Sequence, residues 1–316
     1  MIAGLEAVMS GIRIGIGFGS RLGLPSPETL CAYAERAEDL DIDSIWLSDR
    51  VSGPQPQLDI ACVMAVFAAR TKRIKMGPSV LTLPARHPVE VARAYATLDY
   101  LTGGCGRVIM AVGLGTDPRD CEACGVPADE RGARMAEGVE ILRKLWSEPR
   151  VTHHGRYYRF DDVTIEPRPV RGPLDIWIGG RTDLALRRVA RYGDGWFPSF
   201  ITAEEFRRGM QALAAYGAER GRTIDPGEAG TLILTYVTDD RARADALLQL
   251  AAATFKTTPA AMAERCAIGD VDACAARIQG FVDAGCTKFV LFPLAPPDEL
   301  VGQIELYGRR LIPRFG

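Results

Sequence analysis

The sequence predicts an α/β fold, a (β/α)8 TIM barrel, because short apolar runs alternate with helical patterns along the chain. Two of these runs, 73–82 and 107–115, are rich in β-branched residues and stop at glycine or a turn. A run that is apolar at nearly every position is typical of a parallel strand covered on both faces. Strands begin about every thirty residues, the length of one βαβ unit. We therefore expect one barrel domain over residues 1–316.

Eight strands and the helices between them follow from these patterns. The strands are expected at 12–18, 44–48, 74–81, 108–112, 174–178, 195–198, 232–237 and 288–292. The helices are expected at 26–40, 58–69, 88–102, 130–146, 182–192, 203–220, from about 240, at 271–283 and at 297–311. Ser26 and Pro27 illustrate a helix start, with a capping hydroxyl and then a proline at the first helical position.

Four segments depart from this rhythm. Residues 151–168 are polar, aromatic and extended, and they predict a β-hairpin inserted after the fourth helix, with exposed histidines His153 and His154 pointing opposite ways. We expect a long loop at 116–128, a mobile segment at 254–269 and a loose leader at 1–10. The hairpin, the loop and the mobile segment are expected to form the wall of the substrate pocket.

An open doubly wound sheet is the competing fold. It would place a glycine-rich turn between the first strand and its helix. Here Gly15, Gly17 and Gly19 fall within and at the end of the strand pattern, and not between strand and helix. They are therefore a weak indication of a dinucleotide-binding fold.

The composition indicates which classes of partner the protein is not expected to bind. A formal net charge of −2 indicates neither nucleic acid nor a membrane surface as a partner, and no apolar run is long enough to span a bilayer. We see no secretory signal at the start of the chain. The eight cysteines are expected to be reduced thiols of a cytoplasmic protein. The three histidines are too scattered to predict a metal site.

An ordered set of short motifs resembles the luciferase-like monooxygenase family, in its branch that uses the deazaflavin coenzyme F420. The motifs are 44–49 (SIWLSD), 76–80 (MGPSV), 86–88 (RHP), 94–99, 113–115 (GLG), 177–181 (WIGGR) and 193–196 (GDGW). The resemblance implies a flavin-type ring at the C-terminal face of the barrel and hydride transfer to or from a small organic substrate. It also implies a non-proline cis peptide between Ser79 and Val80, which backs the ring; the alternative is an ordinary trans strand end.

The turn Gly179-Gly180-Arg181-Thr182-Asp183 lies between a strand and a helix. Glycines let backbone N–H groups approach an anion, and the helix N-terminus favours negative charge. The resemblance implies that this turn binds the phosphate of the cofactor, with the Thr182 hydroxyl capping the helix or contacting the phosphate. The alternative is a tight turn with an ordinary helix cap.

Other positions are assigned by the same resemblance. Asp49 is a candidate acceptor near the ring, or a surface carboxylate paired with Arg50. Arg50 is a candidate catalytic residue where many family members carry histidine; because arginine does not exchange protons near neutral pH, it would hold an anionic substrate or stabilise negative charge. The Thr82 hydroxyl could reach the ring, and His87 could lie in the pocket as a catalytic residue or serve only to start a helix.

Gly113, Leu114 and Gly115 are expected to leave room for the ring. The next residue is Thr116, where deazaflavin sugar-phosphate dehydrogenases carry glutamate, which argues against activity on glucose 6-phosphate. Cys121 and Cys124 have redox-motif spacing but lack the strand and helix that flank such motifs, so we expect two loop thiols.

The leading functional hypothesis is therefore an F420-dependent oxidoreductase. One alternative is a two-component monooxygenase that uses reduced FMN supplied by a separate reductase. A second alternative is a flavin-binding barrel without catalysis, suggested by the departures at Arg50 and Thr116. A homodimer fits the family resemblance.

Overall fold

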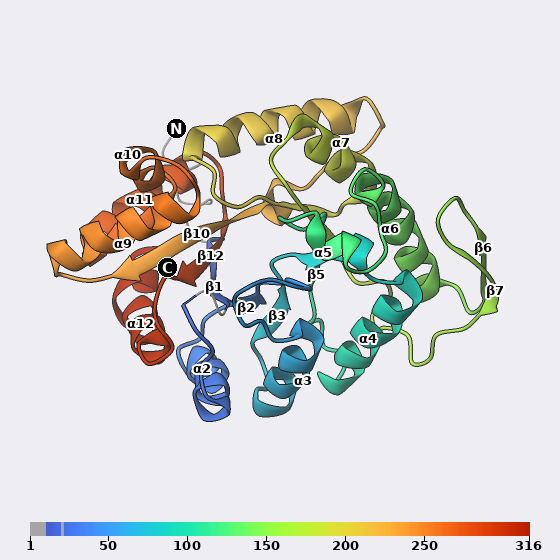
Figure 1. Cartoon of the computed structure of the whole chain (residues 1–316), viewed down its shortest axis with the longest axis horizontal. Helices are drawn as coiled ribbons and strands as arrows, with labels where there is room; N and C mark the ends of the chain where they lie inside the picture. Colours follow the sequence, from blue (N-terminus) through green and yellow to red (C-terminus); the bar gives the residue numbers. More distant parts are fainter. Residues whose placement is uncertain (1–10, 20–21) are drawn as a thin grey trace.

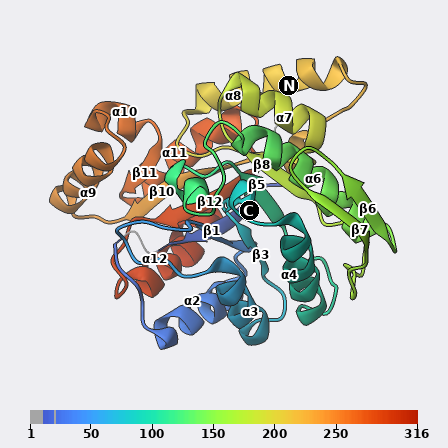
Figure 2. The ribbon, with the colours of Figure 1, turned by 45° about the vertical axis from the view of Figure 1, so that its right-hand side comes forward.

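The computed structural model describes residues 11–19 and 22–316, so the expected leader at 1–10 lies outside the described residues. Strands and helices alternate, and helices surround the strands (Figures 1 and 2). The strands are β1 (Arg13–Phe18), β2 (Ser44–Leu47), β3 (Lys75–Pro78), β4 (Leu81–Thr82), β5 (Met110–Gly113), β6 (Val151–His154), β7 (Arg159–Val163), β8 (Ile176–Gly179), β9 (Gly195–Phe197), β10 (Gly230–Val237), β11 (Cys266–Gly269) and β12 (Lys288–Pro293). The α-helices are α2 (Pro27–Asp39), α3 (Ile60–Arg70), α4 (Pro88–Leu101), α5 (Arg119–Glu122), α6 (Arg131–Ser147), α7 (Asp183–Tyr192), α8 (Ala203–Ala218), α9 (Arg241–Thr254), α10 (Pro259–Ala263), α11 (Val271–Asp283) and α12 (Leu300–Leu306).

The strands that the helices surround pair in parallel, as predicted. Their ladders form one sheet in the order β11-β10-β12-β1-β2-β3 and a second in the order β4-β5-β8-β9. Isolated parallel bridges connect the two sheets at both sides, from Met76 of β3 to Val108 and from Trp196 of β9 to Ala229. Strands β1, β2, β3, β5, β8, β9, β10 and β12 thus follow one another around a ring, which confirms the predicted (β/α)8 barrel.

Aromatic side chains fill the interior of the ring. Trp46 of β2 contacts Trp177 of β8 and Phe197 of β9, with ring centroids 5.8 and 4.6 Å apart. Gly17 of β1 leaves space for another ring, because a Cβ there would lie only 2.1 Å from Cδ2 of Phe292. The glycines of the first strand therefore serve interior packing and not a dinucleotide.

A buried ion pair closes the opposite end of the barrel, where the strands begin. Lys288 at the start of β12 is 1% exposed and binds the Asp43 carboxylate and, at 3.1 Å, the Ser44 hydroxyl. Burial lowers the pKa of Lys288 to about 8, although Asp43 opposes this shift. Burial alone would raise the pKa of Asp43, but Lys288 and Lys75 hold it well below its usual value.

Three expected segments differ from the structure. Residues 254–269 are not an irregular mobile segment, because they contain α10 and β11, and β11 pairs with the end of β10. The loop 116–128 contains the short helix α5. The last helix begins at Leu300 and continues as a π-helix, η3 (Tyr307–Leu311). Short 3-10 turns complete the chain at η1 (Leu83–Ala85), η2 (Pro226–Glu228) and η4 (Ile312–Arg314).

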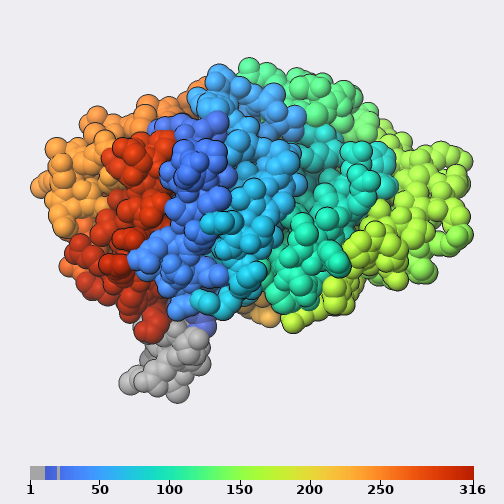
Figure 3. Space-filling view, turned by 90° about the horizontal axis from the view of Figure 1, so that it is seen from below, coloured from blue at the N-terminus to red at the C-terminus, as the bar shows by residue number. Residues whose placement is uncertain are grey.

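The predicted hairpin is formed by β6 and β7, and it lies outside α4 and α6 at the edge of the molecule (Figures 1 and 3). His154 is exposed and faces Asp161, whereas His153 is buried against Glu137 of α6, with 3.1 Å between Nε2 and Oε1. The opposite directions of the two histidines are confirmed, but the expected exposure of His153 is wrong, because Glu137 draws it inward.

Two whole-chain expectations can be compared with the structure. All eight cysteines are free thiols, as predicted. Among the described residues, no helix has the length and apolar character needed to cross a membrane.

We predict that Asp43→Asn lowers the free energy of unfolding at pH 7 by about 3–5 kcal/mol, since buried Lys288 loses its carboxylate. The folded-state pKa of Asp43 is depressed, so its stabilisation is present above about pH 4 and is lost as the pH falls. Urea unfolding from pH 7 to pH 3 should show the difference between wild type and variant shrinking with acid. Asp41→Asn, with an 85% exposed side chain, is the control and should change little. A difference independent of pH would contradict the prediction.

Candidate active site

The carboxyl ends of the strands bring the predicted ring-binding positions together. The Ser79-Val80 peptide between β3 and β4 is cis, which confirms the expectation drawn from the family resemblance. Val80 extends toward two glycines, because a Cβ on Gly113 would lie 2.5 Å from its Cγ2 and a Cβ on Gly179 3.1 Å from its Cγ1. The ends of β3, β5 and β8 thus meet around one half-buried valine, which forms an apolar floor at the mouth of the barrel.

Asp49 holds this floor in place from the end of β2. Its side chain is 1% exposed and binds Arg86 through both carboxylate oxygens, at 2.8 and 2.9 Å. It also accepts a 2.8 Å hydrogen bond from the backbone N–H of Thr82. Burial alone would lower the pKa of Arg86, but Asp49 raises it above its ordinary value. Asp49 is therefore neither a surface carboxylate nor the partner of Arg50; it anchors the chain that follows the cis peptide.

Two hydroxyls beside the floor have no hydrogen-bond partner within the described part of the chain. They belong to Ser79 and Thr82, and both oxygen atoms are buried. Thr82 lies beneath Gly115, where a Cβ would be 3.1 Å from its hydroxyl oxygen, and Gly115 has a φ of +77° that favours glycine. A buried hydroxyl without a partner is costly, so these two atoms are candidates to bind a ligand or an ordered water.

The glycine turn after β8 reaches the same mouth. Thr182 caps α7 by accepting a 3.3 Å hydrogen bond from the Ala185 N–H, and Gly180 has a φ of +116°. Arg181 is exposed and donates to the Phe200 carbonyl at 3.2 Å. The first N–H groups of a helix lack acceptors within the helix, so this turn offers donors to an anion.

The carboxylate of Asp183, the last residue of that turn, is directed to other partners. Its carboxylate binds Arg187 at 2.9 Å and the hydroxyl of Tyr216 on α8, and these contacts lower its pKa. The carboxylate thus serves the outer contact between α7 and α8.

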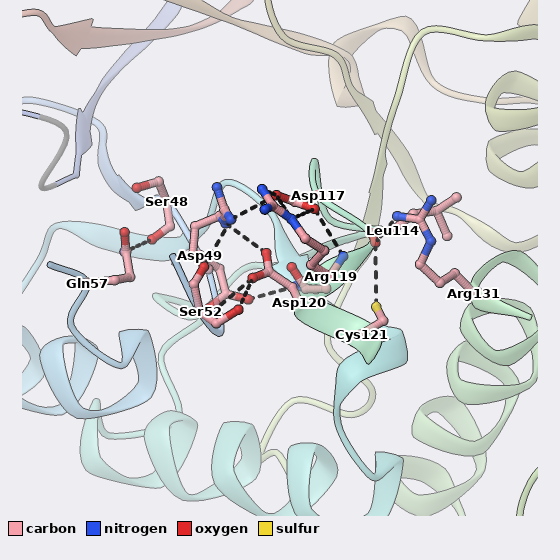
Figure 4. Close-up of polar contacts among 12 residues, drawn as sticks. Ser48, Asp49, Ser52, Gln57, Leu114, Asp117, Arg119, Asp120, Cys121 and Arg131 are labelled. Carbon is pink, nitrogen blue, oxygen red and sulfur yellow. Dashed lines mark hydrogen bonds and ion pairs between the residues drawn. The ribbon is translucent and has the colours of Figure 1, made fainter. Parts of the chain in front are cut away.

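The segment after β5 crosses the mouth and carries α5, which lies in front of the strand ends in Figure 1. The Leu114 carbonyl accepts a 3.3 Å hydrogen bond from Arg131 and contacts Sγ of Cys121 at 3.9 Å (Figure 4). Arg131 also donates to the Ala128 carbonyl at 3.0 Å. Arg131 was not among the residues predicted from the sequence; its position at the start of a helix at the carboxyl ends of the strands was the available signal.

Arg50, the first candidate catalytic residue, is bound to this crossing segment. Its Nε donates to Asp120 at 2.8 Å, and its Nη2 lies 3.6 Å from Asp117 and 3.0 Å from the Ser52 carbonyl. Asp117 also binds Arg119 (Figure 4), whose hydrogen bonds lower the pKa of Asp117 to about 2. The guanidinium of Arg50 is thus already paired with carboxylates.

His87, the second candidate catalytic residue, lies at the start of α4 and faces the hairpin. Its Nδ1 accepts a 3.4 Å hydrogen bond from the Val89 N–H, as an N-cap does. The exposed imidazole packs edge-on against Tyr158, with ring centroids 5.3 Å apart. These contacts match the alternative in which His87 serves to start a helix.

We predict that Asp49→Asn lowers the free energy of unfolding by about 3 kcal/mol, because Arg86 loses a buried bidentate partner. Asp59→Asn is a matched control: it removes the same charge at the cap of α3, where asparagine caps as well as aspartate. Chemical denaturation of both variants measures the difference. Equal stability of the two variants would mean that the Asp49–Arg86 pair does not hold the mouth.

Residues 9–258 match the family model described as luciferase-like monooxygenase. An F420-dependent glucose-6-phosphate dehydrogenase of Kineococcus radiotolerans is 30% identical over 89% of this chain and 91% of its own length. One from Nocardia farcinica is 32% identical over 95% and 97%.

Solved structures share the fold. An F420-dependent secondary alcohol dehydrogenase in complex with an F420-acetone adduct superposes with a TM-score of 0.83, at 19% identity over 96% of this chain and 99% of that one. Monooxygenase RslO1 from Streptomyces bottropensis gives 0.82, at 22% identity over 96% and 100%. The family model matched over residues 9–258 and the 30% identical full-length relative show that the chain belongs to the luciferase-like monooxygenase family.

Proposed function

We propose that this protein is an oxidoreductase that exchanges a hydride between the deazaflavin coenzyme F420 and a small organic substrate. The observation that carries the proposal is the mouth of the barrel, where Val80 contacts Gly113 and Gly179. The glycine turn at 179–183, which could bind a phosphate at the start of α7, lies beside it. The names of the full-length relatives, F420-dependent dehydrogenases, support the choice of cofactor.

The residues at the mouth fit a flat ring with an anionic tail. Val80 forms an apolar floor on which a ring could rest, and Gly113 and Gly179 leave the space that the Val80 side chain occupies. The unpartnered Ser79 and Thr82 hydroxyls are the nearby groups that a ring edge could satisfy. When bound, the deazaflavin supplies a carbon that donates or accepts a hydride, and the protein's part is to orient it.

The anionic tail is assigned to the turn after β8. The backbone of Gly179 and Gly180, the Thr182 hydroxyl and the exposed Arg181 would hold its phosphate. Asp183 is left out of this assignment, because its carboxylate is committed to Arg187 and Tyr216. Leu114 and Gly115 would border the ring from the segment that crosses the mouth.

The alternatives differ in chemistry that can be measured. A two-component monooxygenase would bind reduced FMN from a separate reductase and consume oxygen. A flavin-binding barrel without catalysis would bind a cofactor and turn over no substrate. The paired state of Arg50 and the cap role of His87 leave the proton donor unassigned among the described residues. A single domain, a homodimer and a cytoplasmic location are further parts of the proposal, and light scattering tests the dimer.

We predict that calorimetric titration will give a lower dissociation constant for F420 than for FMN, with no oxygen consumed during turnover. Preference for reduced FMN together with oxygen uptake would overturn the choice of cofactor.

We also predict that Thr182→Val raises the dissociation constant for F420 about tenfold, because it removes one hydroxyl from the phosphate site. Thr182→Ser keeps the hydroxyl and should bind F420 like wild type. Loss of the helix cap costs about 1 kcal/mol, so denaturation curves should accompany the titrations. Unchanged affinity in Thr182→Val would remove this residue from the site.

A further inference from the structure

A buried carboxylate that the proposed chemistry does not use lies over the mouth. Asp120 of α5 is fully buried, although α5 belongs to a loop that the sequence predicts to be irregular. One oxygen accepts hydrogen bonds from the N–H and hydroxyl of Ser52, at 3.0 and 3.1 Å. The other accepts from Nε of Arg50 at 2.8 Å. Asp120 therefore joins the loop after β2 to the segment after β5.

The charges of this cluster cancel. Arg50 and Arg119 carry two positive charges, and Asp117 and Asp120 carry two negative charges, within one set of contacts. The other arginine on this side of the mouth, Arg86, is paired with Asp49. In the described part of the chain, Arg50, Arg86 and Arg119 on this side of the mouth are thus each paired with a carboxylate.

The side toward α7 is different. Arg131 and Arg181 donate to backbone carbonyls, and within residues 11–19 and 22–316 neither lies within ion-pair distance of a carboxylate. Arg181 acts on Glu205 at longer range, but the ion-pair partner of Glu205 is Arg265. The positive charges near the glycine turn before α7 are therefore free of direct carboxylate partners, whereas the charge of Arg50 is neutralised by one.

From this contrast we infer that Asp120 is a specificity-determining residue, which neutralises Arg50 and so selects an uncharged substrate, such as an alcohol or its carbonyl product, over a phosphorylated or carboxylated one. This inference rests on the proposed function, because it names the substrate class of the same site. It separates this chain from relatives whose names specify glucose 6-phosphate.

The energetic reason lies in the burial of Asp120. An anion that recruited Arg50 would have to break its charge-assisted hydrogen bond to a carboxylate that water cannot reach. The stranded carboxylate would keep its two bonds to Ser52 but lose its cation, and an uncompensated buried charge is strongly unfavourable. Arg50 can therefore shape the pocket while contributing little to the binding of anions.

The test is anion binding to the cofactor-free protein, which does not depend on the identity of the cofactor. Inorganic phosphate and glucose 6-phosphate are titrated calorimetrically, at constant ionic strength, into wild type, Arg50→Met, Asp120→Asn and the double variant. Asp120→Asn keeps an acceptor for Ser52 but removes the charge that occupies Arg50. Glu122→Gln removes one charge from an exposed position of the same helix and is the matched control.

Wild type, Arg50→Met and Glu122→Gln should bind each anion equally. Asp120→Asn should bind glucose 6-phosphate about tenfold more tightly than wild type, and the double variant should lose that gain. The inference is overturned if Arg50→Met weakens anion binding several-fold, because Arg50 would then already serve anions. It is also overturned if Asp120→Asn, with circular dichroism matching wild type, binds no more tightly. The Arg50→Met result decides alone if Asp120→Asn does not fold.

Discussion

A carboxylate that water scarcely reaches holds the mouth of this barrel together. Asp49 ends β2, yet its partners are Arg86 and the backbone of Thr82, which belong to the chain after β3. Both ends of the Ser79–Thr82 segment are thus fixed: β3 is held by its ladder to β2, and Thr82 is held by Asp49. Val80 can project between Gly113 and Gly179 only while this segment keeps its path.

The interior of the barrel supplies the other half of that constraint. Trp46, Trp177 and Phe197 come from three strands and pack against one another inside the ring. Lys288 and Asp43 lie at the starts of the strands, and Val80 lies at the ends of the strands. Because the interior is packed solid, a ligand at this face meets the barrel only at its rim, where loops can differ without loss of the core.

The sequence predicted what depends on local pattern and missed what depends on distant pairing. Every strand of the ring was predicted because a buried strand is apolar along its length. Strand β11 was missed, since Cys266-Ala-Ile-Gly269 is short and follows a polar segment. The partners Asp49 and Arg86 are 37 positions apart and follow no period, so no window of sequence contains their contact. The cis peptide was expected from family resemblance alone, because no residue pattern reveals an ω angle.

The candidate site divides in the same way. The glycines at the strand ends could be predicted as candidate site positions from the sequence, because close approach of a ligand to the backbone favours glycine. The pairing of Arg50 could not be predicted from the sequence, because its partner Asp120 lies 70 positions away. Asp120 belongs to a helix too short to show an amphipathic period. Arginine in a pocket suggests an anion only when its charge is free.

Two features of the mouth could attract an anion, the start of α7 and Arg50, and they differ in whether a carboxylate can neutralise them. Backbone N–H groups at the start of α7 are present whatever side chains surround them, so the phosphate role proposed for this turn depends on the fold. An arginine on a loop can be neutralised by one carboxylate, so its contribution is a property of the local sequence. A fold of this kind can keep such a turn while changes in two loops alter the charge of the substrate it accepts. Asp120 and Arg50 lie on those two loops, so under our proposal the substrate class depends on these loops and not on the turn.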